Sequence, residues 1–483
     1  MSRTLTATSL LSVSLLLGCP KAPVEPPTQT RIYNTVPEPL APRAFQLPEL
    51  AEGALSNGIS VSVVENHEVP FVYVQLIIES GSWTDPADQP GLARATMDML
   101  NEGTASHSAS ELSTALRVLA SDLGSSANLN GGTVSVRSLT QNLEPTLDLM
   151  ASVAMTPTFP AEDWSVLQAN YVQEVKAVPL NPSAISRRAW NRLMYGSEYG
   201  GHLTTVEGYE SLTVDDMSGW YSTHMIPANT SILVGGDTTL EEILPLLEAR
   251  FGGWEATGEL DELTAGTVPA ADTGTIYLID KPGASQSIVR LGQEIGDRQA
   301  EDAMAFEMAN VALGGQFTAR INMNLREDKG WTYGASSWLA YNHYPGVWNV
   351  YSSVVTPHTA DSVQEILNEV QGMLGERPMT QAELDAGKGD RLGSWPVRFE
   401  QPSYLLDSSL NVQRYGLPSD WLTSYPDRIR SVTLEQAQAA FNSRIDPNKF
   451  IILVVGDAAT VRAPLEALGI PVVMLSNDGN PLD

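Results

Sequence analysis

The sequence predicts an α+β fold made of two homologous domains, each a mixed sheet packed with helices. Segments with strand periodicity alternate along the chain with segments of helical periodicity. In addition, one motif occurs twice: SILVGGD ends at Asp237 after the tripeptide 227–229, and FIILVVGD ends at Asp457 after the tripeptide 447–449. A repeat distance of about 220 residues is typical of two related domains, because solenoid repeats are roughly 20–50 residues long.

Length and charge limit the classes of protein that the chain can belong to. Its 483 residues suffice for two or three domains with large cores. The formal net charge of −29 argues against a nucleic-acid partner, which needs a basic surface. It also argues against electrostatic docking to anionic lipid. A solvated acidic surface is the simplest interpretation, and recognition of basic peptides is the alternative.

The N-terminal region predicts a secreted, lipid-anchored protein. Residues 1–18 resemble a lipoprotein signal peptide, and LLGC at 16–19 resembles a bacterial lipobox that ends at Cys19, the single cysteine. A plain signal peptide with a chance cysteine is the alternative. Residues 19–44 are Pro-rich without hydrophobic periodicity and predict an extended tether. Pro20 provides no inner-membrane retention signal, so we expect an outer-membrane anchor that faces the periplasm of a bacterial envelope.

The first predicted domain comprises residues 45–255. Alternation of apolar residues with serines around 59–63 predicts one strand, and FVYVQLIIES at 71–80 predicts a second strand buried on both faces. Ser108 and Glu111 have the spacing of a capping box at the start of a helix. A later helix is predicted around Trp164 and Tyr171.

The second predicted domain, residues 275–483, repeats this plan after a linker at 256–274 that is rich in Asp, Glu, Thr, Gly and Ala. Apolar runs predict two strands and then several helices before the closing strand. The predicted strands lie around 276–279 and 287–291, and the predicted helices around 301–313, 362–375 and 381–391.

Several stretches together resemble one known family. They are GLARATMDMLNEGT at 91–104 after Gly81-Ser82, SEYGGHLTTVEGYESL at 197–212, and LREDKGWTYG at 325–334 after LGG at 313–315. Over about residues 45–475 the chain resembles the pitrilysin/insulinase zinc peptidases, in their two-domain branch similar to the mitochondrial processing peptidase. The resemblance implies two homologous domains that pair with a second chain or half to form a clamshell around a peptide.

In this family an H-x-x-E-H motif supplies two zinc ligands and the general base. The corresponding positions here hold Arg94, Met97 and Asp98, and only Glu174 matches the family's third ligand. The resemblance therefore implies that this chain has no metal cofactor and no intact catalytic site. We expect Glu174 to be a relic carboxylate paired with Arg94. A weakly held ion such as calcium between Asp98 and Glu174 is the alternative.

The resemblance also assigns a substrate-binding role to Arg326 and Tyr333. In the family, an arginine and a tyrosine at this spacing lie in the second domain, hold the substrate and polarise its scissile carbonyl. A guanidinium offers forked donors to carbonyl oxygens, and a phenol adds a donor where oxyanion charge develops. On spacing alone, a helix-end arginine and an ordinary strand tyrosine are the simpler interpretation.

The chain is therefore predicted to be the catalytically incomplete subunit of a heterodimeric zinc metallopeptidase. A homologous partner would carry the zinc, this chain would supply Arg326 and Tyr333, and peptides would be hydrolysed only by the complex. The alternative is a non-enzymatic scaffold or peptide-binding lipoprotein. A metal-free hydrolase is poorly supported, because no G-x-S-x-G motif occurs. Gly-Gly pairs at 200–201 and 314–315 are interpreted as turns rather than hinges.

Overall fold

The computed structural model describes residues 46–196, 199–255, 258, 260, 271–341 and 346–482. Cys19, the signal peptide, the tether and most of the predicted linker lie outside these residues, so the predictions on them stay predictions. Among the helices described, none combines the length and the apolar character needed to cross a bilayer. We call residues 46–255 the first half and residues 271–482 the second half.

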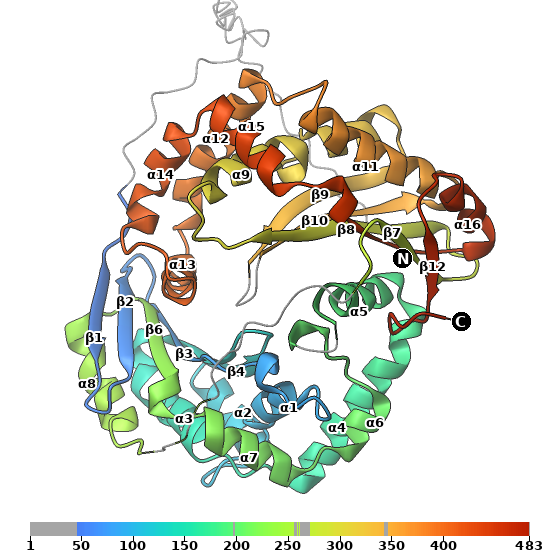
Figure 1. Cartoon of the computed structure of the whole chain (residues 1–483). Coiled ribbons are helices and arrows are strands. Elements are labelled where there is room, and N and C mark those ends of the chain that lie inside the picture. The colour runs from blue at the N-terminus through green and yellow to red at the C-terminus, as the bar shows by residue number, and fades with distance from the viewer. Residues whose placement is uncertain are drawn as a thin grey trace, which may run out of the picture. The chain divides into compact units, whose positions relative to one another are not determined.

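Two six-stranded mixed sheets form the framework (Figure 1). The first has the strand order β1-β2-β6-β3-β5-β4 and the second the order β12-β7-β11-β8-β10-β9. The strands of the first sheet are β1 (Leu50–Ala54), β2 (Ser60–Glu65), β3 (Phe71–Ile78), β4 (Asp122–Ala127), β5 (Gly132–Leu139) and β6 (Thr230–Gly236). Those of the second are β7 (Thr275–Asp280), β8 (Gln286–Gly296), β9 (Thr332–Ala340), β10 (Gly346–Val355), β11 (Ile451–Gly456) and β12 (Val472–Leu475).

The two sheets are built the same way. Apart from the edge strands β1 and β12, each sheet has five strands in the same arrangement. The first of these five along the chain pairs in parallel with the last: β2 with β6, and β7 with β11. That last strand pairs antiparallel with the second strand, β3 or β8. The repeated SILVGGD and FIILVVGD motifs form β6 and β11, which hold the same place in each sheet. The predicted α+β fold of two related domains is confirmed.

The helices repeat as well. The first half contains α1 (Leu92–Met99), α2 (Ala109–Val118), α3 (Leu143–Met155), α4 (Ala161–Ala177), α5 (Pro182–Tyr195), α6 (Val206–Ser211), α7 (Val214–His224) and α8 (Leu240–Phe251). The second contains α9 (Ala303–Asn310), α10 (Arg320–Asn322), α11 (Thr359–Leu374), α12 (Gln381–Arg398), α13 (Pro402–Arg414), α14 (Trp421–Ser431), α15 (Leu434–Arg444) and α16 (Ala458–Glu466). From α3 and α11 onward the two series run in the same order between corresponding strands.

Local sequence explains where several helices begin. The predicted capping box at Ser108 and Glu111 is confirmed at the start of α2. Equivalent boxes start α7, α8, α12 and α15, where a threonine side chain accepts a hydrogen bond from the backbone N–H of the third helical residue. Each box satisfies backbone donors that the helix itself leaves free.

Two sequence predictions need correction. Strand β3 is not buried on both faces: Phe71 is exposed, and Tyr73 and Gln75 are half-buried between fully buried apolar residues. The helix predicted over 301–313 begins at Ala303, and its α-helical part ends at Asn310. Residues Val311–Gly315 continue it as a π-helical turn that brings the glycine pair close to β9.

The halves exchange one helix each. Helix α5 packs on the second sheet, where Ile185 and Trp190 join a buried cluster with β7, β8 and β11. Trp190 also donates from Nε1 to Oδ1 of Asn349 on β10, at 2.9 Å. Helix α13 packs on β2 and β6 of the first sheet and places Leu405 and Leu406 in a core shared with it. Each sheet is therefore covered on one face by a helix from the other half.

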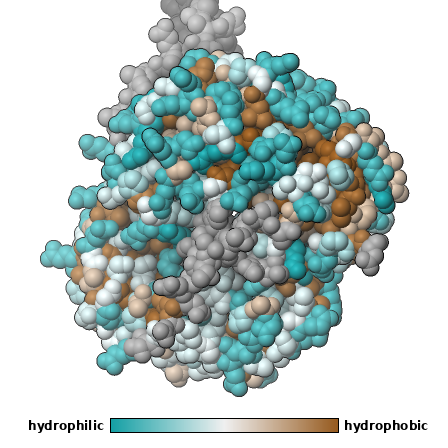
Figure 2. Space-filling view, viewed as in Figure 1, coloured by the Kyte–Doolittle hydropathy of each residue, from teal (hydrophilic) through white to brown (hydrophobic). Residues whose placement is uncertain are grey.

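The surface is mixed in hydropathy. In Figure 2 many hydrophilic residues cover the face shown, together with residues of intermediate hydropathy and smaller hydrophobic patches. Apolar side chains lie mainly inside, in one large cluster for each half and a third where α5 meets the second sheet. The sites described next lie on helices and strands that these cores hold in place.

Candidate functional site

The degenerate motif lies on α1, whose start is fixed by a buried carboxylate. Gly91 adopts φ 100° just before the helix, a conformation that glycine tolerates best. Asp85 accepts hydrogen bonds from the backbone N–H groups of Gly91 and Ala93, each at 2.7 Å. Burial raises the pKa of Asp85 to about 7, although both hydrogen bonds act to lower it. The N-terminal turn of α1 is therefore held rigidly.

Arg94 makes the main contacts at the former metal position. Its Nη2 lies 3.0 Å from Oε2 of Glu174 on α4, and its Nε lies 3.6 Å from Oδ2 of Asp98 one turn along α1. The guanidinium carbon is 4.7 Å from the ring centroid of Tyr171. The structure thus brings together Arg94, Asp98 and Glu174, which the sequence singled out separately.

Two tyrosines complete this cluster. The hydroxyl of Tyr171 donates to Oδ2 of Asp98 at 2.5 Å, and the ring of Tyr171 stacks on that of Tyr209 with centroids 4.9 Å apart. Burial raises the pKa of Asp98, while the hydrogen bond from Tyr171 and the charge of Arg94 oppose this rise. Both candidate carboxylate ligands are thus already engaged by side chains of the protein.

Met97 replaces the general base and belongs to the core. Its side chain is fully buried in the first-half cluster. It packs against β5 so closely that a Cβ atom on Gly132 would lie 3.1 Å from its sulfur. A thioether in this place can neither accept a proton at neutral pH nor orient a water molecule for attack.

These residues do not fit a zinc ion. A catalytic zinc needs three protein ligands drawn from His, Cys, Asp or Glu and an open position for water. Here an arginine lies between the two remaining carboxylates. Within the described residues, no three His, Cys, Asp or Glu side chains are grouped so that they could hold a metal ion.

The second predicted site, Arg326, lies in a π-helical segment, η7 (Met323–Asp328), that follows α10. Its Nη1 donates to Oε1 of Glu327 at 2.6 Å. Its guanidinium carbon lies 4.5 Å from the ring centroid of Phe317. Phe317 is itself 64% exposed, so the stacked pair faces solvent rather than the core. The forked donors of Arg326 are therefore only partly used.

Tyr333 lies at the start of β9, the edge strand of the second sheet, and is 91% exposed. Together with Phe317 and Trp338 it lines a cavity of about 360 Å³ beside the Gly314-Gly315 turn. Phe317 thus links the two predicted residues: it stacks on Arg326 and shares this cavity with Tyr333. Phe317, Tyr333 and Trp338 thus form an exposed aromatic group beside the turn.

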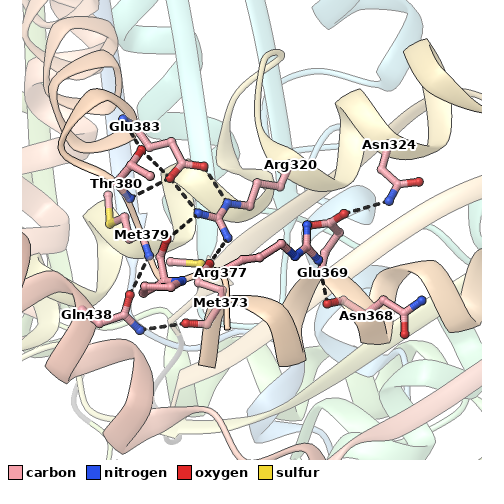
Figure 3. Close-up of polar contacts among 11 residues, drawn as sticks. Arg320, Asn324, Asn368, Glu369, Met373, Arg377, Met379, Thr380, Glu383 and Gln438 are labelled. Carbon is pink, nitrogen blue, oxygen red and sulfur yellow. Dashed lines mark hydrogen bonds and ion pairs between the residues drawn. The ribbon is translucent and has the colours of Figure 1, made fainter. Parts of the chain in front are cut away.

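A polar network supports the segment that carries Arg326 (Figure 3). Arg320 on α10 binds both carboxylate oxygens of Glu383, at 2.6 and 2.7 Å. It also donates to the backbone carbonyls of Arg377 and Pro378. Asn324 in η7 donates to Glu369 at 2.7 Å. Bidentate guanidinium–carboxylate pairs are geometrically specific, so they fix α10 and η7 against α11 and α12.

Sequence reasoning missed several residues of both regions. Tyr171 lies one helical turn before Glu174, so helical spacing could have placed the two side chains on one face. Phe317 lies two residues after the Gly-Gly pair, but nothing in its spacing predicts exposure. Asp85 precedes the α1 segment by several residues, and only the fold shows that it caps the helix.

The fold and the altered site define a two-domain protein of the metallopeptidase type whose own metal ligands are lost. Comparison with known families agrees with this class. The model described as "Insulinase (Peptidase family M16)" matches residues 60–204, and the model "Peptidase M16 inactive domain" matches residues 211–389. The chain belongs to the M16 peptidase family, and it is of the inactive-subunit type.

Relatives from several bacteria span most of the chain. An "uncharacterized zinc protease" of Mycobacterium leprae is 22% identical over 80% of this chain and 87% of its own length. The "non-peptidase homolog YmxG" of Helicobacter pylori is 21% identical over 83% and 92%. A solved M16 inactive domain from Pseudomonas fluorescens superposes with a TM-score of 0.78 at 24% identity, over 84% of this chain and 98% of that one.

The chain also superposes on part of a longer solved relative. The periplasmic protease PqqL of Escherichia coli superposes with a TM-score of 0.71 at 17% identity. The match covers 85% of this chain but only 46% of PqqL. The present fold therefore corresponds to about half of that protein.

Proposed function

We propose that this chain is the metal-free, substrate-holding subunit of a heterodimeric zinc peptidase. Its own motif cannot hold zinc, whereas Arg326 and the 91% exposed Tyr333 remain available to a ligand. The observation on which the proposal depends is the exposure of Tyr333, which shares a cavity with Phe317, the ring that stacks on Arg326. The match to half of PqqL supports pairing, because a second unit in a separate chain would supply the remaining half.

In the complex, Arg326 and Tyr333 would act on the peptide rather than on the metal. The guanidinium can donate two parallel hydrogen bonds to backbone carbonyl oxygens and so fix the register of an extended peptide. The Tyr333 hydroxyl can donate to the scissile carbonyl oxygen as negative charge develops on it. The partner's zinc would supply the activated water. Binding of a peptide carbonyl would compete with the Arg326–Glu327 contact.

The test is to purify this chain and a zinc-bearing M16 partner, and to assay peptide hydrolysis by each chain alone and by the mixture. We expect this chain alone to be inactive and free of stoichiometric zinc, and the mixture to be active. Arg326→Ala should then raise the activation barrier by about 2–4 kcal/mol, as loss of an oxyanion donor does. The effect should lie mainly in kcat.

Arg462→Ala is the matched control, because Arg462 lies on α16, away from η7, and pairs with Glu466 on the same helix. Loss of activity in both variants would indicate a nonspecific effect on folding. Unchanged turnover in Arg326→Ala would show that Arg326 has no catalytic role. Tyr333→Phe separates the hydroxyl from the ring and should lower kcat with little change in stability, because the residue is exposed.

A scaffold or peptide-binding role is the second candidate. It is favoured by the Helicobacter pylori relative, whose name describes a non-peptidase homologue. Under this hypothesis the mixture with the zinc-bearing chain stays at the activity of that chain alone, while the two chains still associate. Analytical ultracentrifugation of the mixture, combined with the activity assay, distinguishes the two functions.

We further propose that Cys19 anchors the mature chain to the bacterial outer membrane on its periplasmic side. The lipobox-like sequence that ends at Cys19 and the Pro-rich stretch after it support this proposal. Labelling with a radioactive fatty acid should mark the wild-type protein but not Cys19→Ser. Equal labelling of both would contradict the anchor.

A further inference from the structure

A small cavity beside Arg94 has a basic lining that the degenerate motif does not explain. Its volume is about 200 Å³, and it lies between α4, α5 and the segment 199–204. Arg94, Arg187 and Arg188 line it together with His202, and Glu174 is the one acidic residue of the lining. The whole chain has 28 Lys and Arg against 57 Asp and Glu, so acidic residues predominate overall. Around this cavity the balance is reversed, with three arginines and one glutamate.

The arginine charges are only partly offset. Arg94 is paired with Glu174 and Asp98. Arg188 is paired with Asp478, whose carboxylate approaches from the C-terminal turn at 2.8 Å. In the described part of the chain, no carboxylate forms an ion pair with Arg187, which is exposed on the same helix. Arg187 therefore provides a charge that a ligand can neutralise.

A fourth guanidinium increases the positive potential near the cavity. Arg290 on β8 is half-buried and donates from Nε to Oγ of Ser186, the residue before Arg187. Among the residues that the structure describes, no acidic side chain pairs with it. Burial lowers the pKa of Arg290, and the charge of Arg187 lowers it further against the effect of Tyr351. Arg290 thus adds a positive charge next to the residue that precedes Arg187.

The cavity is also preorganised. The side chain of Arg188 is only 11% exposed, because Asp478 and the hydroxyl of Thr204 hold its guanidinium from two sides. Arg94 is held by Glu174, Asp98 and the ring of Tyr171. Donors that are fixed before binding lose little conformational entropy when a ligand arrives.

We propose that this cavity binds a carboxylate group, and that the ligand is a peptide that presents its C-terminus or an acidic side chain. Guanidinium groups bind carboxylates in forked geometry. The cavity is smaller than the roughly 300–1,000 Å³ of sites for whole drug-sized ligands, so it suits one end group or one side chain. Glu174 on the wall would repel a doubly charged phosphate more strongly than a singly charged carboxylate.

Carboxylate binding needs neither zinc nor a partner chain, whereas the identification of the ligand as a peptide rests on the proposed function. The position that holds a cation in active relatives would thus hold an anion here. Such a cavity would anchor one end of a peptide in this chain, apart from Arg326 and Tyr333.

The experiment measures binding of a short, fluorescent, N-acetylated peptide to this chain alone by fluorescence anisotropy. Three forms are compared: a free C-terminus, an amidated C-terminus, and an amidated C-terminus with one internal glutamate. We expect the amidated peptide without glutamate to bind about ten-fold or more weakly than the free-carboxylate form, the loss expected for a charge-assisted hydrogen bond. The third form shows whether a side-chain carboxylate serves equally.

Arg187→Gln should reproduce the weakening and leave the fold intact, because Arg187 is exposed. Arg192→Gln is the matched control: Arg192 lies on the same helix, donates to the carbonyl of Gly196 at 3.2 Å and does not line the cavity. Equal binding of the free and amidated forms, equal loss in the two variants, or tighter binding of inorganic phosphate would each overturn the proposal.

The outcome is independent of the peptidase assay. The free-carboxylate peptide can bind through Arg187 while the mixture with a zinc-bearing chain stays inactive. In that case the cavity proposal is supported and the split-peptidase function is wrong. If the mixture is active and Arg187→Gln changes neither binding nor KM, the function stands and the cavity proposal fails.

Discussion

Position 97 shows how far the first site has departed from a catalytic one. In active relatives a glutamate there faces a metal-bound water. In this chain Met97 is fully buried and packs against β5. The base and two of the three metal ligands of the motif are therefore all replaced, and restoring one residue restores none of the others.

Met97→Glu should lower the free energy of unfolding by about 3 kcal/mol or more, because it buries a carboxylate without a partner. Met97→Leu conserves the volume and should cost less than about 1.5 kcal/mol. Urea denaturation followed by circular dichroism measures both. Similar stability of the two variants would show that the packing around position 97 admits a charged group.

Asp85 should give the stability a measurable pH dependence. Its folded-state pKa is raised from the ordinary 3.8 to about 7, so the folded protein holds this proton more tightly than the unfolded chain does. The resulting stabilisation is complete below about pH 4 and is lost as the pH rises to about 7.

Asp85→Asn cannot titrate but keeps one acceptor for the start of α1. The stability difference between wild type and this variant should therefore shrink between pH 5 and pH 8, as urea unfolding at each pH can show. Asp88→Asn, an exposed change in the same loop, is the control. A difference that grows with pH would show that folding lowers the pKa of Asp85 instead of raising it.

Residue identity predicted much of the candidate site. The loss of three motif positions, the match of Glu174 and the Arg326/Tyr333 pair all follow from the sequence and its family resemblance. The surroundings of these residues could not be predicted, because Tyr171, Phe317 and Arg187 reach the sites only through the packing of α4, the glycine turn and α5.

At the scale of elements, the α10–η7 segment depends on the clamp between Arg320 and Glu383. Their side chains are 13% and 27% exposed. Burial raises the pKa of Glu383, but hydrogen bonds from Arg320 and Thr380 outweigh it and lower the pKa overall. The pair therefore stabilises the fold more than a solvated ion pair does. Because η7 directly follows α10, the pair also fixes the position of Arg326.

A double-mutant cycle with Arg320→Ala and Glu383→Gln should yield a coupling energy of about 1–3 kcal/mol in unfolding. The exposed pair Arg137–Asp122, with side chains 64% and 74% exposed, should yield about 0.2–1 kcal/mol. Thermal and urea unfolding of the wild type and of the three variants in each cycle provide the data. Equal coupling in both cycles would mean that the clamp contributes no more than a surface contact.

Elements with clear local signals were predictable. The capping box of α2 and the apolar runs of β2, β6, β7 and β11 lie where the sequence places them. Helices α5 and α13 were not predicted, although each begins at a proline, Pro182 or Pro402, which is a common first helical residue. Their apolar faces pack on the opposite half, and no local pattern shows this.

At the scale of the whole molecule, the exchange of α5 and α13 makes the halves interdependent. Each sheet is packed on one face by a helix from the other half. The ion pair between Arg414 on α13 and Glu79 after β3, at 3.0 Å, adds a polar contact between the halves. We therefore expect residues 46–482 to unfold in one transition.

Expression of residues 46–255 and 271–482 as separate chains tests this. Each alone should be insoluble or bind hydrophobic dyes, because the face that normally receives the exchanged helix is exposed. Together they should form a soluble one-to-one complex. Two soluble, independently melting halves would show that the exchanged helices are dispensable.

The exchange of helices also says something about ancestry. Two copies of a single half, each extending one helix onto the sheet of its neighbour, would already form a symmetric, closed dimer. Joining the two genes end to end would preserve every contact between them. Once joined, the copies no longer had to remain identical, so one could lose its chemistry while the other kept its own side chains under selection. On this view, the two halves differ at their sites because they diverged after joining: one half lacks metal ligands, and the other carries Arg326 and Tyr333.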